Sequence, residues 1–470
     1  MTSQVNTEPN APRHARGLSA SAVLSPPHEG CVLPAALHGT LVPSPPTPAG
    51  LLGRSRLHLH ENHMVRNSMY SLLSSGLQAG LGFAFWILAT RMFSAPAVGR
   101  ATSLIAATTV IAFVALFGLN STLGRFLPTS VHRDTMVTVA LLIVGVGGTL
   151  IAVGYVIALP LIAPQLRFLD DRITFALVFA LLSGATAVNF VTDAVFIASR
   201  RTGINLLVDG GIGGVVKVAL VPLLAGTGAY GLYCASAGGF AAAALASVLL
   251  MCTRLHYRPR IKKAVEVMRP LLRFSTANYL GNVFNLVPGL VVTLIVLDRL
   301  GAVDAAYYFV AFQVANLLFA GAFAVEQNFL AEGARGEEPL KRLMWRAAKM
   351  LAMMSVPAAI AGALLAHPVL LLFGHSYALH GSETLMLMAL AAIPVAAQNW
   401  LVTVLRLTGQ LFAITVSNAV YAGAICGLAW FLAPRGLGIV GGAWLLGSLA
   451  GVVVATAAVV RGARRGTLAR

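Results

Sequence analysis

The sequence predicts an all-α integral membrane protein with about twelve transmembrane helices in two pseudo-symmetric six-helix bundles. Of its 470 residues, 57% are hydrophobic and 10% are charged, and the mean hydropathy is +0.80. Soluble domains carry about 25% charged residues, so a water-soluble enzyme is excluded. Long apolar runs and an internal repeat are the other two observations that predict this fold class. The apolar content also excludes disorder outside the N-terminus.

Residues 1–65 differ from the rest and are predicted to form a disordered cytoplasmic tail. They hold nine of the 22 prolines and six of the 11 histidines, without an apolar run that could span a bilayer. The histidines are irregularly spaced, and the four cysteines stand singly, so we expect neither a metal site nor a disulfide framework. No cofactor is expected. An alternative is that translation starts at Met64.

The remaining chain contains twelve apolar runs, each long enough to span a bilayer. About 20 residues at 1.5 Å rise cover a hydrocarbon core of roughly 30 Å. The runs are continuously apolar rather than alternating, which favours helices over a barrel. The expected helices are 69–91, 101–124, 136–162, 174–198, 204–226, 230–252, 274–297, 305–329, 343–366, 383–405, 411–432 and 438–460.

The basic residues fix the expected orientation. With the N-terminus inside, 26 of the 33 lysines and arginines fall on the inner side, six fall outside, and Lys217 lies within a span. This satisfies the positive-inside rule with both termini cytoplasmic. The net charge of +17 is therefore topological and does not indicate nucleic-acid binding. The expected parts are an N-terminal lobe over 66–253, a basic linker over 254–273, a C-terminal lobe over 274–462 and a basic tail over 463–470.

The two halves resemble each other. Shifted by 208 positions, Arg91 falls on Arg299, and the turn Arg200-Arg-Thr-Gly203 meets Arg406-Leu-Thr-Gly409 at an offset of 206. Six helices per repeat return the chain to its starting side, so both halves share one orientation. Two like bundles around a central cavity form a geometry that transporters use for alternating access.

Several segments resemble polysaccharide transporters of the multidrug/oligosaccharidyl-lipid/polysaccharide (MOP) exporter superfamily. They are 91–100, 117–128, 199–205 with 216–220, 405–409 and 437–446. The resemblance implies a flippase that moves an undecaprenyl-pyrophosphate-linked oligosaccharide across the bacterial plasma membrane, and polysaccharide polymerases or ligases as partners. Peptidoglycan-precursor flippases of this superfamily typically have fourteen helices. The twelve expected here favour the O-antigen or exopolysaccharide branch. We expect a monomer.

Other functions remain open. A cation-coupled small-molecule or multidrug exporter of the same superfamily is the nearest alternative. Such antiporters often carry a carboxylate in the first helix, whereas the first span here, 69–91, holds none. A membrane glycosyltransferase would need an acidic site, and Asp170-Asp171 is the candidate, more simply a solvated turn. A scaffold in a cell-wall assembly complex is a third alternative. No catalytic residue is expected, since the protein is predicted not to be an enzyme.

Lys217 is the foremost candidate for substrate binding. Burying a charge in hydrocarbon costs at least ~2.5–3.5 kcal/mol, and Lys217 lies too deep to snorkel. It therefore faces either the cavity or a structural partner. A diphosphate needs cationic donors, and sugars need amides, although each amide could equally form an interhelical hydrogen bond. The further cavity candidates are Arg125, Arg406, Asn278, Asn282, Asn285, Gln398 and Asn399.

A second set of residues could couple or gate transport. Asp193 and Asp209 could bind a coupling cation or pair with Arg200-Arg201. In an ideal α-helix, Asp209 and Lys217 are too far apart to pair directly. Glu326 could form an interlobe gate with Arg125. Arg91 and Arg299 could meet the substrate outside or act as outer-end anchors. We expect the glycines within 210–214 to allow close packing or a kink.

Overall fold

A computed structural model describes residues 76–464, apart from 170–171, 200, 263 and 336–338. The predicted tail over 1–65 lies outside the described residues. Regular structure within them is helical, and eleven helices are long and apolar enough to cross a membrane. Residues 76–92 are helical as well. The prediction of an all-α membrane protein with about twelve spans is confirmed.

In the first half, one predicted helix, 101–124, is broken into two. Its elements after 76–92 are α2 (Ala95–Leu116), α3 (Leu119–Phe126), η1 (Leu127–Thr129), α4 (Arg133–Ile162), η2 (Pro164–Leu169), α5 (Ile173–Ala198), α6 (Thr202–Asn205), η3 (Leu206–Gly213), α7 (Gly214–Leu223), η4 (Ala225–Thr227) and α8 (Gly228–Arg254). The predicted helix 101–124 breaks because Phe117 and Gly118 are left-handed, with φ of 46° and 74°. Two such residues cannot continue a right-handed helix.

The second half begins earlier than its first predicted span. Its elements are α9 (Ala264–Leu300), α10 (Ala302–Arg335), α11 (Leu340–Leu364), α12 (Ala366–Leu371), α13 (His375–Leu407), α14 (Leu411–Leu432), η5 (Ala433–Arg435) and α15 (Leu437–Arg464). Since α9 starts at Ala264, the second part of the predicted linker is helical. The lobe boundaries themselves remain a prediction.

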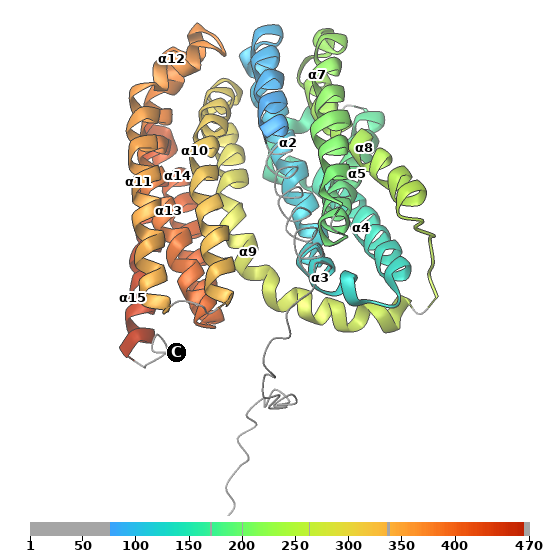
Figure 1. Cartoon of the computed structure of the whole chain (residues 1–470). Coiled ribbons are helices and arrows are strands. Elements are labelled where there is room, and N and C mark those ends of the chain that lie inside the picture. Colours follow the sequence, from blue (N-terminus) through green and yellow to red (C-terminus); the bar gives the residue numbers. More distant parts are fainter. Residues whose placement is uncertain (1–75, 170–171, 200, 263, 336–338, 465–470) are drawn as a thin grey trace, which may run out of the picture. The chain divides into compact units, whose positions relative to one another are not determined.

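The helices of each half pack mainly against one another (Figure 1). In the first half, α5 packs against α4 and α8, and in the second, α13 and α14 pack against α15. The contact between halves runs largely through α2, which packs against α9 and α10. One hydrophobic core extends across this contact and includes Trp86, Phe309 and Trp444.

The repeat seen in the sequence recurs in the backbone. The short 3₁₀ turns η4 and η5 lie 208 residues apart. At the turns that follow α5 and α13, the Arg201 amide donates to the Phe196 carbonyl at 2.9 Å, and the Gln410 amide donates to the Leu405 carbonyl at 2.9 Å, 209 residues later. Two bundles of the same design therefore build the fold.

Candidate functional site

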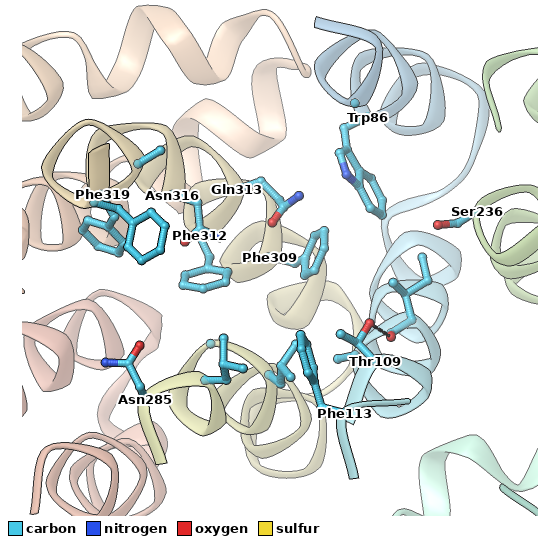
Figure 2. A pocket seen from close by; sticks show the side chains of 18 of the residues that line it. Trp86, Thr109, Phe113, Ser236, Asn285, Phe309, Phe312, Gln313, Asn316 and Phe319 are labelled. Carbon is cyan, nitrogen blue, oxygen red and sulfur yellow. Dashed lines mark hydrogen bonds between the residues drawn. The ribbon is translucent and has the colours of Figure 1, made fainter. Parts of the chain in front are cut away.

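A cavity of about 600 Å³, which we call the central cavity, lies between helices of both halves. Aromatic side chains dominate its wall, and Figure 2 shows Trp86, Phe113, Phe309 and Phe312 around the open space. Trp86 and Phe309 touch across the two halves, with ring centroids 4.7 Å apart. Apolar cavities with a few placed polar groups are the usual form of a small-molecule site.

The polar groups of the central cavity are unevenly distributed between its walls. The second half supplies amides, namely Gln313 and Asn316 of α10, Asn285 of α9 and Asn399 of α13. Asn285 Nδ2 donates to Asn399 Oδ1 at 3.4 Å. The first half supplies Lys217, which is the one cationic side chain among the described residues of the wall. A ligand in this cavity would therefore meet both amides and a positive charge.

Lys217 lies against α8 rather than in an ion pair. Its Nζ atom is 3.2 Å from the centroid of the Phe240 ring, which is a cation–π contact. A Cβ atom on Gly239 would lie 2.1 Å from Lys217 Cγ and 2.7 Å from the Gly213 carbonyl oxygen. The glycine at 239 therefore makes room for the lysine side chain. No described carboxylate forms an ion pair with Lys217.

Gly239→Ala should displace Lys217 and impair the transport expected from the sequence, because overpacking of this kind costs about 1–3 kcal/mol. Gly238→Ala is the matched control, since its Cβ would meet only the flexible Leu220 Cδ1, at 3.2 Å. Export assays at equal protein abundance check this expectation. Equal export by the two variants would show that the position of Lys217 does not matter.

A second cavity of about 200 Å³, the acidic pocket, lies within the first half and contains Asp193 of α5 and Asp209 of η3. Both carboxyl groups line this small pocket and interact electrostatically. Asn189 Nδ2 donates to Asp209 Oδ1 at 3.2 Å. With its side-chain amide turned so that the nitrogen faces the two carboxyl groups, Asn205 donates to Asp193 Oδ1 at 3.1 Å and to Asp209 Oδ2 at 3.2 Å. Asn189 Oδ1 is buried without a hydrogen-bond partner among the described residues.

The glycine-rich run explains how Asp209 reaches this pocket. Residues 206–213 form a π-helix rather than the α-helix assumed from the sequence, and π-helical turns commonly mark functional sites. The wider turn changes the direction of each side chain, so that Asp209 and Lys217 line one pocket. Arg201 is exposed and forms no ion pair with either acid, whereas Arg200 lies outside the described residues. Of the two predicted partners Arg200-Arg201, Arg201 therefore does not pair with the acids, which take amide partners.

Two of the other predicted cavity residues do not line the central cavity, and the side chains of three more are not described. Gln398 is buried, and its Nε2 donates to Ser417 Oγ at 2.8 Å, which ties α13 to α14 instead of lining the central cavity. Arg406 is likewise absent from the described wall of this cavity and acts electrostatically on Glu326. The side chains that fall outside the description are those of Arg125, Asn278 and Asn282.

The predicted gating residues have distinct contacts. Glu326 is buried and accepts a hydrogen bond from Thr403 Oγ1 at 2.7 Å, a contact within the second half. Arg91 Nη2 donates across the halves to the carbonyl oxygens of Leu371 at 3.2 Å and Leu372 at 3.1 Å, at the C-terminal end of α12. Arg299 stacks on Trp430 at 4.3 Å, a contact suited to an anchor.

The sequence model of a family described as polysaccharide biosynthesis protein matches residues 87–379, more than half of the chain. The chain belongs to this family. This match confirms the resemblance to a polysaccharide biosynthesis family. The sequence has no match among curated proteins.

Solved structures show the same fold. A multidrug resistance MATE transporter of the MOP superfamily, inward-facing, has a TM-score of 0.63 at 16% identity, covering 84% of this chain and 98% of that one. Lipid II flippase MurJ, inward closed, has a TM-score of 0.64 at 11% identity, covering 84% and 87%. A MOP transporter from Pyrococcus furiosus has a TM-score of 0.55 at 15% identity, covering 87% and 96%. This family member therefore has the two-bundle MOP fold.

Proposed function

We propose that the protein is a flippase for an undecaprenyl-pyrophosphate-linked oligosaccharide, working by alternating access in polysaccharide biosynthesis. The observation that carries the proposal is the central cavity, whose wall contains a cation from the first half and several amides from the second half among aromatic rings. Lysine binds phosphate as a point charge, and amides can donate to and accept from sugar hydroxyls. The family match to a polysaccharide biosynthesis protein supports this substrate class.

The size of the cavity limits what enters it. About 600 Å³ is within the usual range of roughly 300–1,000 Å³ for small-molecule sites. It accommodates a diphosphate and the first sugars, while the lipid chain stays in the bilayer and the distal sugars extend beyond the wall. Lys217 would meet the diphosphate, and Gln313, Asn316, Asn285 and Asn399 would meet the sugars.

The acidic pocket supports cation-coupled transport. Two neighbouring carboxyl groups repel each other unless a proton or cation lies between them. Asn189 Oδ1 is a further buried oxygen without a partner among the described residues, and oxygen ligands suit hard cations. We assign Asp193 and Asp209 to this coupling site, Glu326 and Arg91 to gating, and Arg299 to outer anchoring.

The cellular setting follows from the same proposal. The protein would lie in the bacterial plasma membrane with both termini cytoplasmic, as a non-enzymatic monomer that delivers substrate to polymerases or ligases. The lobes would be 66–253 and 274–462, joined through 254–273. Arg125 and Arg406, on the inner side in this topology, would attract the diphosphate before it enters.

A cation-coupled small-molecule exporter is the second candidate, favoured by the predominance of aromatic rings in the wall. Gln313→Leu combined with Asn316→Leu separates the two, because it removes amides while keeping similar volume. We expect this variant to lose affinity for undecaprenyl-pyrophosphate-linked sugar but to retain affinity for sugar-free undecaprenyl pyrophosphate, as measured with purified protein. Each lost hydrogen bond contributes about 0.5–1.5 kcal/mol. Equal loss for both ligands, or none, would contradict sugar recognition by these amides.

A further inference from the structure

The central cavity and the acidic pocket share part of their walls. Lys217 and Phe240 line both of them, as does Gly82. The ammonium group of Lys217 therefore stands at the boundary between a space that contains two carboxyl groups and a space suited to an anionic ligand. Any change of charge on one side acts on the same lysine that serves the other side.

The present contact of Lys217 is with an aromatic ring and not with a described charged group of either cavity. Its ammonium lies over the neutral Phe240 ring at 3.2 Å, and no described carboxylate forms an ion pair with it. Asp209 acts on it through space, in a site where low dielectric strengthens such effects. The charged groups of the described residues that line either cavity around Lys217 are Asp193 and Asp209.

We infer that Lys217 couples the two cavities: a cation in the acidic pocket releases the ammonium group toward the central cavity, where it binds the diphosphate. This inference rests on the proposed function. While the carboxylates are uncompensated, they attract Lys217 and reduce its availability to an anion. A sodium ion or a proton cancels this attraction. By thermodynamic linkage, the diphosphate must then raise the affinity for the cation by the same factor.

The test measures binding of farnesyl diphosphate to the full-length protein in lipid nanodiscs by calorimetry. The titrations are made in choline buffer, in sodium buffer, and in choline buffer at lower pH, so that sodium and proton are distinguished. We expect one of these cations to tighten binding on the order of tenfold. Asp209→Asn should bind tightly without added cation and lose this dependence, which also controls for protonation of the ligand itself. Asp298→Asn, on the exposed part of α9, should behave as wild type.

Lys217→Gln should bind weakly under all three conditions. Size-exclusion profiles and melting temperatures establish that each variant is folded, and Asp193→Asn replaces Asp209→Asn if the latter is not. Binding that depends on Lys217 but responds to neither cation would overturn the coupling and leave the proposed function intact. Failure of the wild type to bind farnesyl diphosphate would overturn both.

Discussion

Lys217→Ala should abolish export of the lipid-linked oligosaccharide without reducing the amount of protein in the membrane. The ammonium group is the one cation in the described wall of the central cavity, so no neighbouring side chain there can replace it. A hydrogen bond to a charged group contributes about 1.5–3 kcal/mol, or roughly 10- to 150-fold in affinity. Lys217→Arg should retain part of the activity, because it keeps the charge but changes its position.

Export by polysaccharide production and protein abundance by immunoblot check this prediction, with the exposed Lys349→Ala as the matched control. A structural role for Lys217 would give a different pattern. In that case, Lys217→Ala would lower the melting temperature and the abundance, and export per molecule would stay normal. Normal export in Lys217→Ala would contradict the role assigned to the residue.

Gly99→Ala should separate the two halves at the helix ends that the sequence predicts to lie outside the cell. A Cβ atom on Gly99 would lie 1.7 Å from the Ala302 carbonyl oxygen and 3.1 Å from the Ala306 amide nitrogen. Both are backbone atoms of α10, so a side-chain rotation cannot relieve the clash. Overpacking costs about 1–3 kcal/mol, which shifts the equilibrium between closed and open ends roughly 5- to 150-fold.

The measurement is thiol labelling of a cysteine introduced at Ser236, in the central cavity, with other cysteines replaced. An impermeant reagent added outside should label Gly99→Ala faster than the parent. Gly154→Ala is the control, since a Cβ there has nothing within 4 Å. Unchanged labelling in a folded Gly99→Ala protein would show that these helix ends do not close the cavity.

Hydropathy, charge placement and the repeat were enough to predict the fold, because each span must satisfy its own backbone hydrogen bonds in lipid. They did not predict the break at Phe117, since an aromatic residue gives no sign of a left-handed backbone. The π-helix over 206–213 was also missed. A glycine-rich run indicates that the backbone can depart from α-helical geometry, but which conformation it adopts depends on the neighbouring helices.

The candidate site was predicted only in part. The depth of Lys217 in its span predicted its place, because a charge at that depth needs a cavity or a partner. The acid–amide cluster required tertiary contacts, although Asn189 and Asp193 are four residues apart and share a helix face. Gln313 and Asn316, three residues apart on α10, carried a similar signal. Gln398 showed the limit of such patterns, since its amide bonds to Ser417.

Reconstitution tests the central claim most directly. Purified full-length protein in liposomes would be supplied with undecaprenyl-pyrophosphate-linked oligosaccharide, and the fraction of sugar accessible to an external glycosidase would be followed over time. We expect accessibility to rise faster with wild-type protein than with Lys217→Ala, and fastest under an imposed sodium or proton gradient. Equal rates with wild-type protein and with protein-free liposomes would contradict the assignment as a flippase.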